Sequence, residues 1–413
     1  MKTRRTVVTG AIAASMAIAA LAWGHPVGAG DAPTSGGGQS ITVMIAASGP
    51  AETAAVEAAV AGWEAESGNS VDLIPAEDIN LQLGQALAGG DPPDVFYVNA
   101  DKFQEYASGG SLAAVGDQLT DPDDFYPALT SVFTYEDELY CAPKDFSTLG
   151  LVINTDMWEE AGLTDADIPT TWEQLADVAA TLTTDDHVGL ASGATRDRVG
   201  AFFVSGGGYF VSEDQSEVTA DTPENLATLE YIQGMLEAGS YNFTENMDMG
   251  WGGEALGRGV TAMTIEGNWI RGAMTNDFPD INYTVAELPE GPGGKGSMAF
   301  TQCWGVAAAS DQQEVGVDFV NFMTAVEQQV ALANAFGVMP SRASAADAFL
   351  ADNPDFAPFL AAAEYARGQV SLPAFIAVLT EFDQQLLAMS NGDADPADIL
   401  GDLQANGEDA LGG

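Results

Sequence analysis

Short apolar strands alternate with amphipathic helices along the first part of the chain, and this alternation limits the fold more than any other feature. Residues 41–45, 71–74 and 94–98 have strand character, whereas residues 52–66 and 81–87 carry apolar side chains at helical spacing. Such alternation predicts parallel strands covered by helices. It continues beyond the length of one domain, and the chain after residue 314 is mostly helical in pattern. We therefore expect an α/β protein of two lobes with a helical C-terminal tail.

The first 29 residues have the pattern of an export signal. Two arginines and a lysine among the first five residues precede an apolar run, and small residues up to Ala29 offer a cleavage site. An uncleaved membrane anchor is the alternative, because the run is just long enough to span a bilayer. No cysteine lies near this point, so we expect no lipoprotein anchor. Residues 30–40, rich in glycine, predict a flexible leader, and the protein is expected to be extracellular or periplasmic.

Composition excludes several classes of function. The chain has 61 Asp and Glu against 12 Lys and Arg, a net charge of −49, so it cannot present the basic surface that nucleic acids require. His187 is the only histidine after residue 29, which argues against histidine metal sites and serine–histidine nucleophiles. We expect no metal, no cofactor and no enzymatic activity. A glycosidase-type pair of carboxylates cannot be excluded by counting.

The segment LGLVINTDMW at residues 149–158, followed by EAGL at 160–163 and PTTWEQL at 169–175, resembles the signature of the family 1 extracellular solute-binding proteins. These are the maltose-binding-protein-like receptors of ABC importers. Ile153 and Trp158 depart from the residues usual at their positions, which changes the apolar side chain but not its character. Further matches follow in the family's order at residues 93–95, 109–112, 139–143, 262–269, 288–291 and 338–342.

The resemblance implies the two-lobed periplasmic-binding-protein type II fold, in which two lobes joined by a hinge close over a ligand. The closed form is then expected to dock onto the permease subunits of an ABC transporter. It places the N-terminal lobe at residues 41–142 and 301–345, and the C-terminal lobe at residues 143–300 and 346–413. Ligands of such folds bind in the crevice at loops that leave strand ends. The candidate loops are residues 48–52, 99–101, 144–146, 206–210, 267–269 and 301–304.

A sugar needs aromatic rings for its C–H faces and fixed polar groups for its hydroxyls. Trp269 is the best stacking candidate, whereas Trp304 could equally belong to the core. Glu52 could instead favour the positive end of a helix, and Lys144 could form an ordinary ion pair with Asp145. The predicted ligand-binding residues are Glu52, Asn99, Asp101, Lys144, Asp145, Phe146, Tyr209, Trp251, Asn268, Trp269, Gln302, Trp304 and Arg342.

Cys141 and Cys303 are the only cysteines, and an even count in an exported chain favours a disulfide, with two buried free thiols as the alternative. The resemblance places both near the lobe junction, where a bridge would tether two passes of the chain. We expect a monomeric receptor for a sugar or short oligosaccharide. The alternatives are a receptor for a polyol or a polyamine, and a secreted glycoside-processing enzyme.

Overall fold

The computed structural model describes residues 38–47 and 49–412. The predicted export signal, residues 1–29, and most of the predicted leader lie outside the described residues. The strands are β1 (Ser40–Ile45), β2 (Ser70–Pro75), β3 (Val95–Asn99), β4 (Thr134–Tyr135), β5 (Glu138–Leu139), β6 (Cys141–Asn154), β7 (Val188–Ser192), β8 (Tyr241–Phe243), β9 (Thr261–Gly267), β10 (Tyr283–Ala286), β11 (Ser297–Val306) and β12 (Ala366–Gly368).

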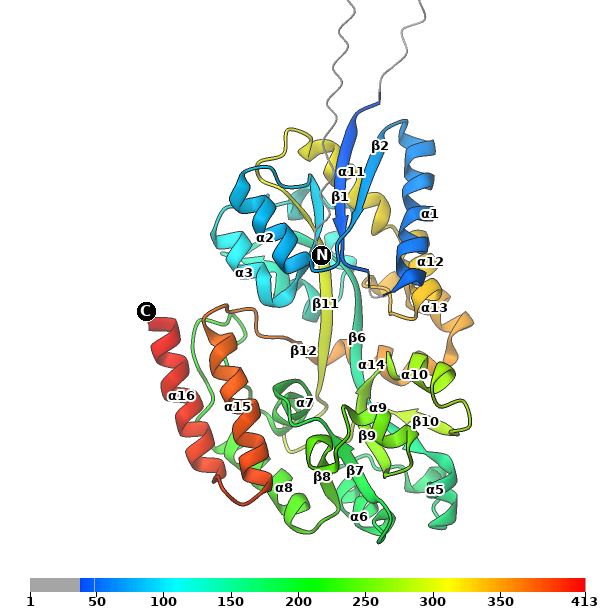
Figure 1. Ribbon diagram of the computed structural model, residues 1–413, viewed down its shortest axis with the longest axis vertical. Coiled ribbons are helices and arrows are strands. Elements are labelled where there is room, and N and C mark those ends of the chain that lie inside the picture. Colours follow the sequence, from blue (N-terminus) through cyan, green and yellow to red (C-terminus); the bar gives the residue numbers. More distant parts are fainter. Residues whose placement is uncertain (1–37, 48, 413) are drawn as a thin grey trace, which may run out of the picture. The chain divides into compact units, whose positions relative to one another are not determined.

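The α-helices follow the same order along the chain (Figure 1). They are α1 (Pro50–Ser67), α2 (Ile79–Gly89), α3 (Ala100–Ser108), α4 (Pro127–Thr130), α5 (Thr155–Glu160), α6 (Trp172–Leu182), α7 (Arg196–Gly206), α8 (Pro223–Glu237), α9 (Gly252–Gly257), α10 (Ile270–Asn276), α11 (Gln313–Met323), α12 (Val326–Phe336), α13 (Ala346–Asp352), α14 (Ala357–Ala361), α15 (Phe375–Ser390) and α16 (Pro396–Gly412).

The early strands and helices confirm the alternation read from the sequence. β1 pairs in parallel with both β2 and β3, and α1 and α2 connect them. Gly68 and Gly90 follow these helices with φ angles of 74° and 75°, a left-handed conformation that glycine adopts without strain. The helical C-terminal tail is also confirmed, because α15 and α16 pack on each other and on α8 (Figure 1).

The sheet has the strand order β2-β1-β3-β11-β6-β9-β7-β8, with β10 on β6 and β12 on β11. β11 runs antiparallel to β3 and to β6, and β6 runs antiparallel to β9. β6 and β11 thus carry the chain from the elements around β1 to those around β7 (Figure 1). The sheet therefore has one parallel group at each end, joined by two long antiparallel strands.

The sequence prediction was wrong about the chain near Lys144. A single strand, β6, runs from Cys141 to Asn154 and includes Pro143. The expected loops at residues 144–146 and 301–304 lie within β6 and β11. Pro143 has no N–H to donate to a neighbouring strand. The structure accommodates it beside a β-bulge, where the ladder is already irregular.

Two large apolar cores lie at opposite ends of β6 and β11, the two strands that cross from one core to the other. The N-terminal core draws its buried side chains from residues 41–142 and 303–332, and the C-terminal core from residues 149–298 and 370–403. A smaller third core contains Phe146, Met339 and Phe359. These ranges resemble those of the two predicted lobes, whose boundaries stay a prediction.

Candidate functional site

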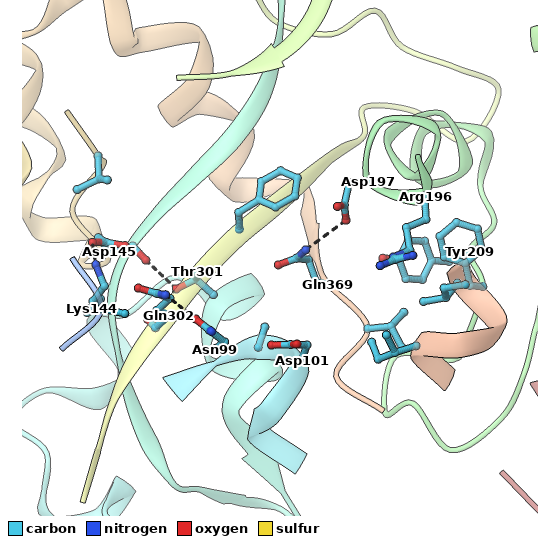
Figure 2. Close-up of a pocket in the computed structure, with 18 of the residues that line it drawn as sticks. Asn99, Asp101, Lys144, Asp145, Arg196, Asp197, Tyr209, Thr301, Gln302 and Gln369 are labelled. Carbon is cyan, nitrogen blue, oxygen red and sulfur yellow. Dashed lines mark hydrogen bonds and ion pairs between the residues drawn. The ribbon is translucent and has the colours of Figure 1, made fainter. Parts of the chain in front are cut away.

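A cavity of about 480 Å3 opens between segments that are far apart in the chain (Figure 2). Side chains from β3, β6 and β11 meet side chains from α7 and from the segment before α15 around it. Its lining residues are Ala46, Glu52, Asn99, Ala100, Asp101, Lys144, Asp145, Arg196, Asp197, Tyr209, Phe210, Phe300, Thr301, Gln302, Phe336, Val338, Gln369, Val370, Ile376 and Leu379.

A bulge in β6 sets the position of Lys144 in this cavity. The register between β6 and β11 shifts between Gln302 and Cys303, so Lys144 has no partner in the ladder. Its carbonyl oxygen accepts a hydrogen bond of 2.6 Å from Gln329 Nε2 instead. The bulge therefore aims the lysine side chain independently of the ladder on either side.

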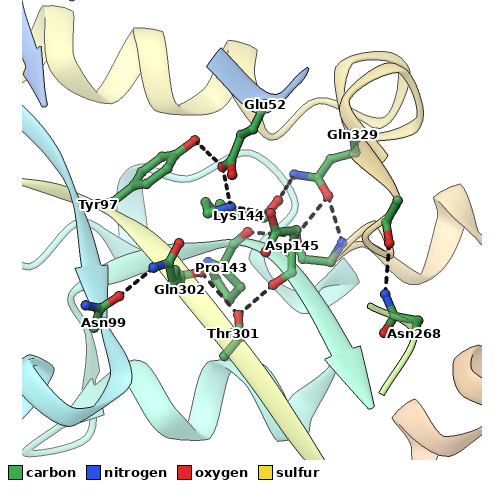
Figure 3. A network of polar contacts seen from close by, with 12 residues as sticks. Glu52, Tyr97, Asn99, Pro143, Lys144, Asp145, Asn268, Thr301, Gln302 and Gln329 are labelled. Carbon is green, nitrogen blue, oxygen red and sulfur yellow. Dashed lines mark hydrogen bonds and ion pairs between the residues drawn. The ribbon is translucent and has the colours of Figure 1, made fainter. Parts of the chain in front are cut away.

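The Lys144 ammonium lies between two carboxylates (Figure 3). Its Nζ is 3.0 Å from Glu52 Oε1 and also binds Asp145 Oδ2. It lies 4.7 Å from the ring centroid of Tyr97, whose hydroxyl donates to Glu52 Oε1 at 3.3 Å. Lys144 is 6% exposed and Glu52 is 2% exposed, so these charges are almost wholly removed from bulk water.

Burial and charge act in opposite directions on this group. Burial alone would lower the pKa of Lys144, but the carboxylates of Asp145 and Glu52 outweigh it and the pKa is raised. Burial raises the pKa of Asp145, which Lys144 opposes. Burial, and then the charge of Glu52, raise the pKa of the Tyr97 hydroxyl well above its ordinary value. Lys144 is therefore charged and Tyr97 neutral at physiological pH.

A chain of amides lies beside the charged group. Gln302 Nε2 donates to Asn99 Oδ1, and Asn99 Nδ2 donates to Asn80 Oδ1 at 3.0 Å. Thr301 Oγ1 donates to the carbonyl of Asp145 at 2.7 Å. In the described part of the chain, Gln302 Oε1 accepts no hydrogen bond, so it remains open to a donor within the cavity.

The opposite wall comes from α7 and the chain after β12. Thr195 caps α7 by accepting from the N–H of Arg198, which places Arg196 and Asp197 in the first turn. Arg196 Nη1 donates to Asp383 Oδ2 at 2.6 Å. Asp197 Oδ1 accepts from Gln369 Nε2 at 3.2 Å (Figure 2). Both walls therefore combine charges with amide groups.

Aromatic rings complete the lining. Phe210, Phe300 and Phe336 border the cavity together with Tyr209. Phe300 meets Trp269 edge to face, with ring centroids 5.3 Å apart and an interplanar angle of 80°. The Trp269 indole is 36% exposed, the largest aromatic surface left open among the described residues.

The structure divides the predicted ligand-binding residues into two groups. The first group lines the cavity and comprises Glu52, Asn99, Asp101, Lys144, Asp145, Tyr209 and Gln302. The second group lies outside its lining and comprises Phe146, Trp251, Asn268, Trp269, Trp304 and Arg342.

Three members of the second group, Trp304, Phe146 and Arg342, are buried and contact other parts of the protein instead of lining the cavity. Trp304 is 1% exposed and packs on Tyr97, because it lies farther along β11 than Gln302, inside the N-terminal core. Phe146 belongs to the third core. Arg342 is buried, and its guanidinium donates to backbone carbonyls, among them those of residues 120, 121 and 324.

The other three members of the second group lie beside β9. Trp251 precedes α9, and Asn268 and Trp269 connect β9 to α10. Asn268 Nδ2 donates to the carbonyl of Gly337 at 2.9 Å. Trp251 packs partly against the small core around Leu256. Trp269 contacts the cavity only through Phe300.

The disulfide partners lie in the N-terminal core. Cys141 and Cys303 are bonded, with Cα atoms 5.6 Å apart, and both are fully buried. The bond joins β6 to β11 on the core side of the Lys144 bulge. It lines no part of the cavity.

Sequence reasoning missed most of the C-terminal wall. The run Thr195-Arg196-Asp197-Arg198 was a detectable signal, because it places two of the few basic residues directly after a helix-capping threonine. Gln369 and its neighbours gave no such signal. They reach the cavity only because the chain returns along β12 beside β11, a pairing between distant segments.

The comparisons with known proteins identify the family. Residues 33–330, well over half of the chain, match the family model described as bacterial extracellular solute-binding protein. The chain belongs to this family. The solute-binding protein is also 26% identical over 292 residues to a maltooligosaccharide ABC transporter solute-binding lipoprotein of Streptococcus pneumoniae. That match covers 65% of the chain and 66% of the relative, just under two thirds of the relative's length.

Solved structures share the fold of this solute-binding protein. A cyclic alpha-maltosyl-1,6-maltose binding protein from Arthrobacter globiformis superposes with a TM-score of 0.82 at 21% identity, covering 91% of this chain and 99% of that one. A protein of Mycobacterium tuberculosis in complex with glycerophosphocholine gives 0.75 at 20% identity, with coverage of 91% and 99%. These likenesses confirm the two-lobed α/β fold, and their ligands differ in chemistry.

Two kinds of feature are absent from residues 38–47 and 49–412. No helix there is long and apolar enough to cross a membrane. No group of three or more His, Cys, Asp or Glu side chains there could hold a metal ion.

Proposed function

We propose that this solute-binding protein is the receptor of an ABC importer and that it binds a sugar or oligosaccharide in the cavity between its two walls. The observation that carries the proposal is the composition of that cavity. It combines carboxylates, amides and aromatic rings contributed by elements on both sides of the crossing strands.

This set of groups suits a polyhydroxylated ligand. Sugar hydroxyls act as donors and acceptors, and the carboxylates of Asp101 and Asp197 and the amides of Gln302 and Gln369 offer both complements. Phe300 and Phe336, which are only partly buried, offer apolar surface to the C–H faces of a pyranose ring. A volume of about 480 Å3 lies within the range typical of small-molecule sites.

Six of the predicted residues are retained in the proposed ligand set: Asn99, Asp101, Lys144, Asp145, Gln302 and Tyr209. Glu52 holds the Lys144 ammonium through an ion pair, and Trp269 extends the aromatic surface beside Phe300. Trp304, Phe146 and Arg342 are left out because they are occupied in packing or in backbone contacts. The names of the relatives, which include maltooligosaccharide and diacetylchitobiose binders, favour an oligosaccharide.

We propose binding without catalysis. A glycoside-processing enzyme needs two carboxyl groups free to act on the scissile bond. Of the four carboxylates in the cavity lining, which include Asp101, Glu52 and Asp145 bind the Lys144 ammonium and Asp197 accepts from Gln369, so three of the four are already engaged. Export, a monomeric state and docking onto permease subunits belong to the same proposal and rest on membership of the family.

The test is a thermal-shift screen of the purified protein, followed by calorimetric titration. The panel contains maltotriose, diacetylchitobiose, mannitol, spermidine and glycerophosphocholine. A ligand that binds only the native state raises the midpoint of unfolding. We expect a saccharide to raise the midpoint of unfolding and spermidine to leave it unchanged. We also expect to recover that saccharide intact after prolonged incubation with the protein. A shift confined to spermidine or glycerophosphocholine would refute the proposal.

A further inference from the structure

A buried glutamate lies directly behind the exposed indole of Trp269. Glu266 is on β9 and is 1% exposed, and neither the cavity lining nor the predicted ligand set includes it. Its Oε2 accepts from Trp269 Nε1 at 2.9 Å and from Arg198 Nη2 at 2.7 Å. Its Oε1 accepts from the N–H of Gly252 at 3.2 Å. Three donors therefore converge on one carboxylate.

The same contacts hold the indole from several sides. The Arg198 guanidinium carbon lies 5.3 Å from the ring centroid of Trp269, within range of a cation–π interaction. A Cβ atom at Gly267 would lie 2.2 Å from this ring, so the indole lies close over the glycine backbone. Phe300 packs edge to face at 5.3 Å and itself lines the cavity. About a third of the indole surface nevertheless stays exposed.

We propose that Glu266 is a positioning residue, which fixes the Trp269 indole beside Phe300 before the ligand arrives. A side chain that is already held in its binding orientation loses less conformational entropy when a ligand stacks on it. The Glu266 carboxylate sets the rotation of the ring through the indole N–H and holds Arg198 against it. The inference deepens the proposed function, because it assigns a role in saccharide affinity to a residue that no ligand touches.

Substitution of Glu266 by glutamine tests the proposal with minimal change of shape. An amide cannot accept from all three donors, and it removes the charge that Arg198 opposes. We expect the E266Q variant to bind maltotriose about tenfold more weakly, and acrylamide quenching of Trp269 emission to increase about twofold. The Trp269 contribution is the difference in emission between proteins with and without the W269F substitution.

A double-mutant cycle separates positioning from a general loss of structure. If Glu266 acts through the indole N–H, E266Q in the W269F background changes maltotriose affinity by less than twofold. Glu105→Gln is the matched control, because Glu105 forms an exposed ion pair with Lys102 at 2.9 Å on α3, which makes none of the contacts given for Glu266 or Trp269. The conservative E266D variant keeps the charge beside Arg198 and serves if E266Q does not fold. It is expected to increase quenching as well.

The outcomes distinguish this inference from the proposed function. Unchanged quenching of Trp269 in E266Q or E266D refutes the inference, as does an equal loss of affinity with and without W269F. Wild-type protein that binds neither maltotriose nor diacetylchitobiose refutes the proposed function, while the quenching measurement still decides whether Glu266 holds the indole.

Discussion

Lys144 Nζ lies 3.0 Å from Glu52 Oε1, and both side chains are buried where the cavity meets the N-terminal core. Glu52 lies in the first turn of α1, whereas Lys144 lies at a bulge in a strand more than ninety residues later in the chain. The contact therefore joins two distant segments through a charge pair with little access to water. Such a pair costs most when one partner is removed, because the other charge remains buried.

Substitution of Lys144 by methionine keeps the length of the side chain and removes its charge. Glu52 and Asp145 then remain close together without a cation. We expect a loss of about 3–5 kcal/mol in the free energy of unfolding, measured in urea. Lys102→Met is the control, because Lys102 forms an exposed pair with Glu105 and should change stability little. Equal stability of the K144M variant and the wild type would show that the buried pair is not needed for folding.

The raised pKa of Asp383 in the folded protein should make the free energy of unfolding depend on pH. Burial raises its pKa to about 6, although Arg196 opposes the shift, and Asp197 and Glu245 add to it. The unfolded chain titrates near the ordinary value of about 4, so the folded state binds more protons between these two pKa values. This group therefore stabilises the fold increasingly as the pH falls from 7 to 4.

The D383N variant lacks this titration. Relative to it, the wild type should gain up to about 3 kcal/mol in the free energy of unfolding between pH 7 and pH 4. Asp214 provides a control of opposite sign, because hydrogen bonds from Ser212 and Ser216 lower its pKa to about 2. Urea titrations at several pH values measure both differences. A wild-type advantage over D383N that shrinks at low pH would contradict the prediction.

Gln302 is predicted to contribute to affinity more than to stability. Its amide lines the cavity and donates to Asn99, and leucine has nearly the same volume without polar atoms. Loss of a hydrogen bond to the ligand costs about 1 kcal/mol, so we expect roughly fivefold weaker saccharide binding by calorimetry. Gln385→Leu, at an exposed contact with Asp402, is expected to leave affinity unchanged. Full affinity in the Q302L variant would remove Gln302 from the ligand set.

The disulfide is predicted to act on stability alone. Cys141 and Cys303 are separated by 162 residues, so the bond restricts the unfolded chain strongly. We expect the double C141A/C303A variant to lose about 2–5 kcal/mol in the free energy of unfolding. Saccharide affinity should stay within about twofold of the wild type, since the bond does not line the cavity. A large loss of affinity in a folded double variant would instead mean that the bond shapes the site.

Local pattern sufficed for much of the fold, because strand and helix periods depend on near neighbours in the sequence. The helices expected at residues 52–66 and 81–87 and the strands expected at 41–45 and 94–98 all occur close to their predicted positions. The unbroken course of β6 through Pro143 was not predictable in this way. It depends on pairing with β11, which lies about 150 residues later.

The candidate site shows the same division. Residues at the carboxyl end of β3, such as Asn99 and Asp101, follow from the general rule for α/β sheets. Trp304 was misplaced because sequence cannot tell how deep along a strand the core begins. Gln369 was missed because its contact with Asp197 joins segments 172 residues apart.

The bulge at Lys144 has a further consequence for how this protein can vary. Side chains along a strand alternate between two faces, so straightening the bulge without removing a residue, with Lys144 paired to Cys303, would turn every preceding side chain of β6 to the other face. Cys141 would then point away from Cys303, and Lys144 would no longer lie between Glu52 and Asp145. Natural variants should therefore keep the bulge and its lysine, and with them the spacing between Cys141 and Asp145.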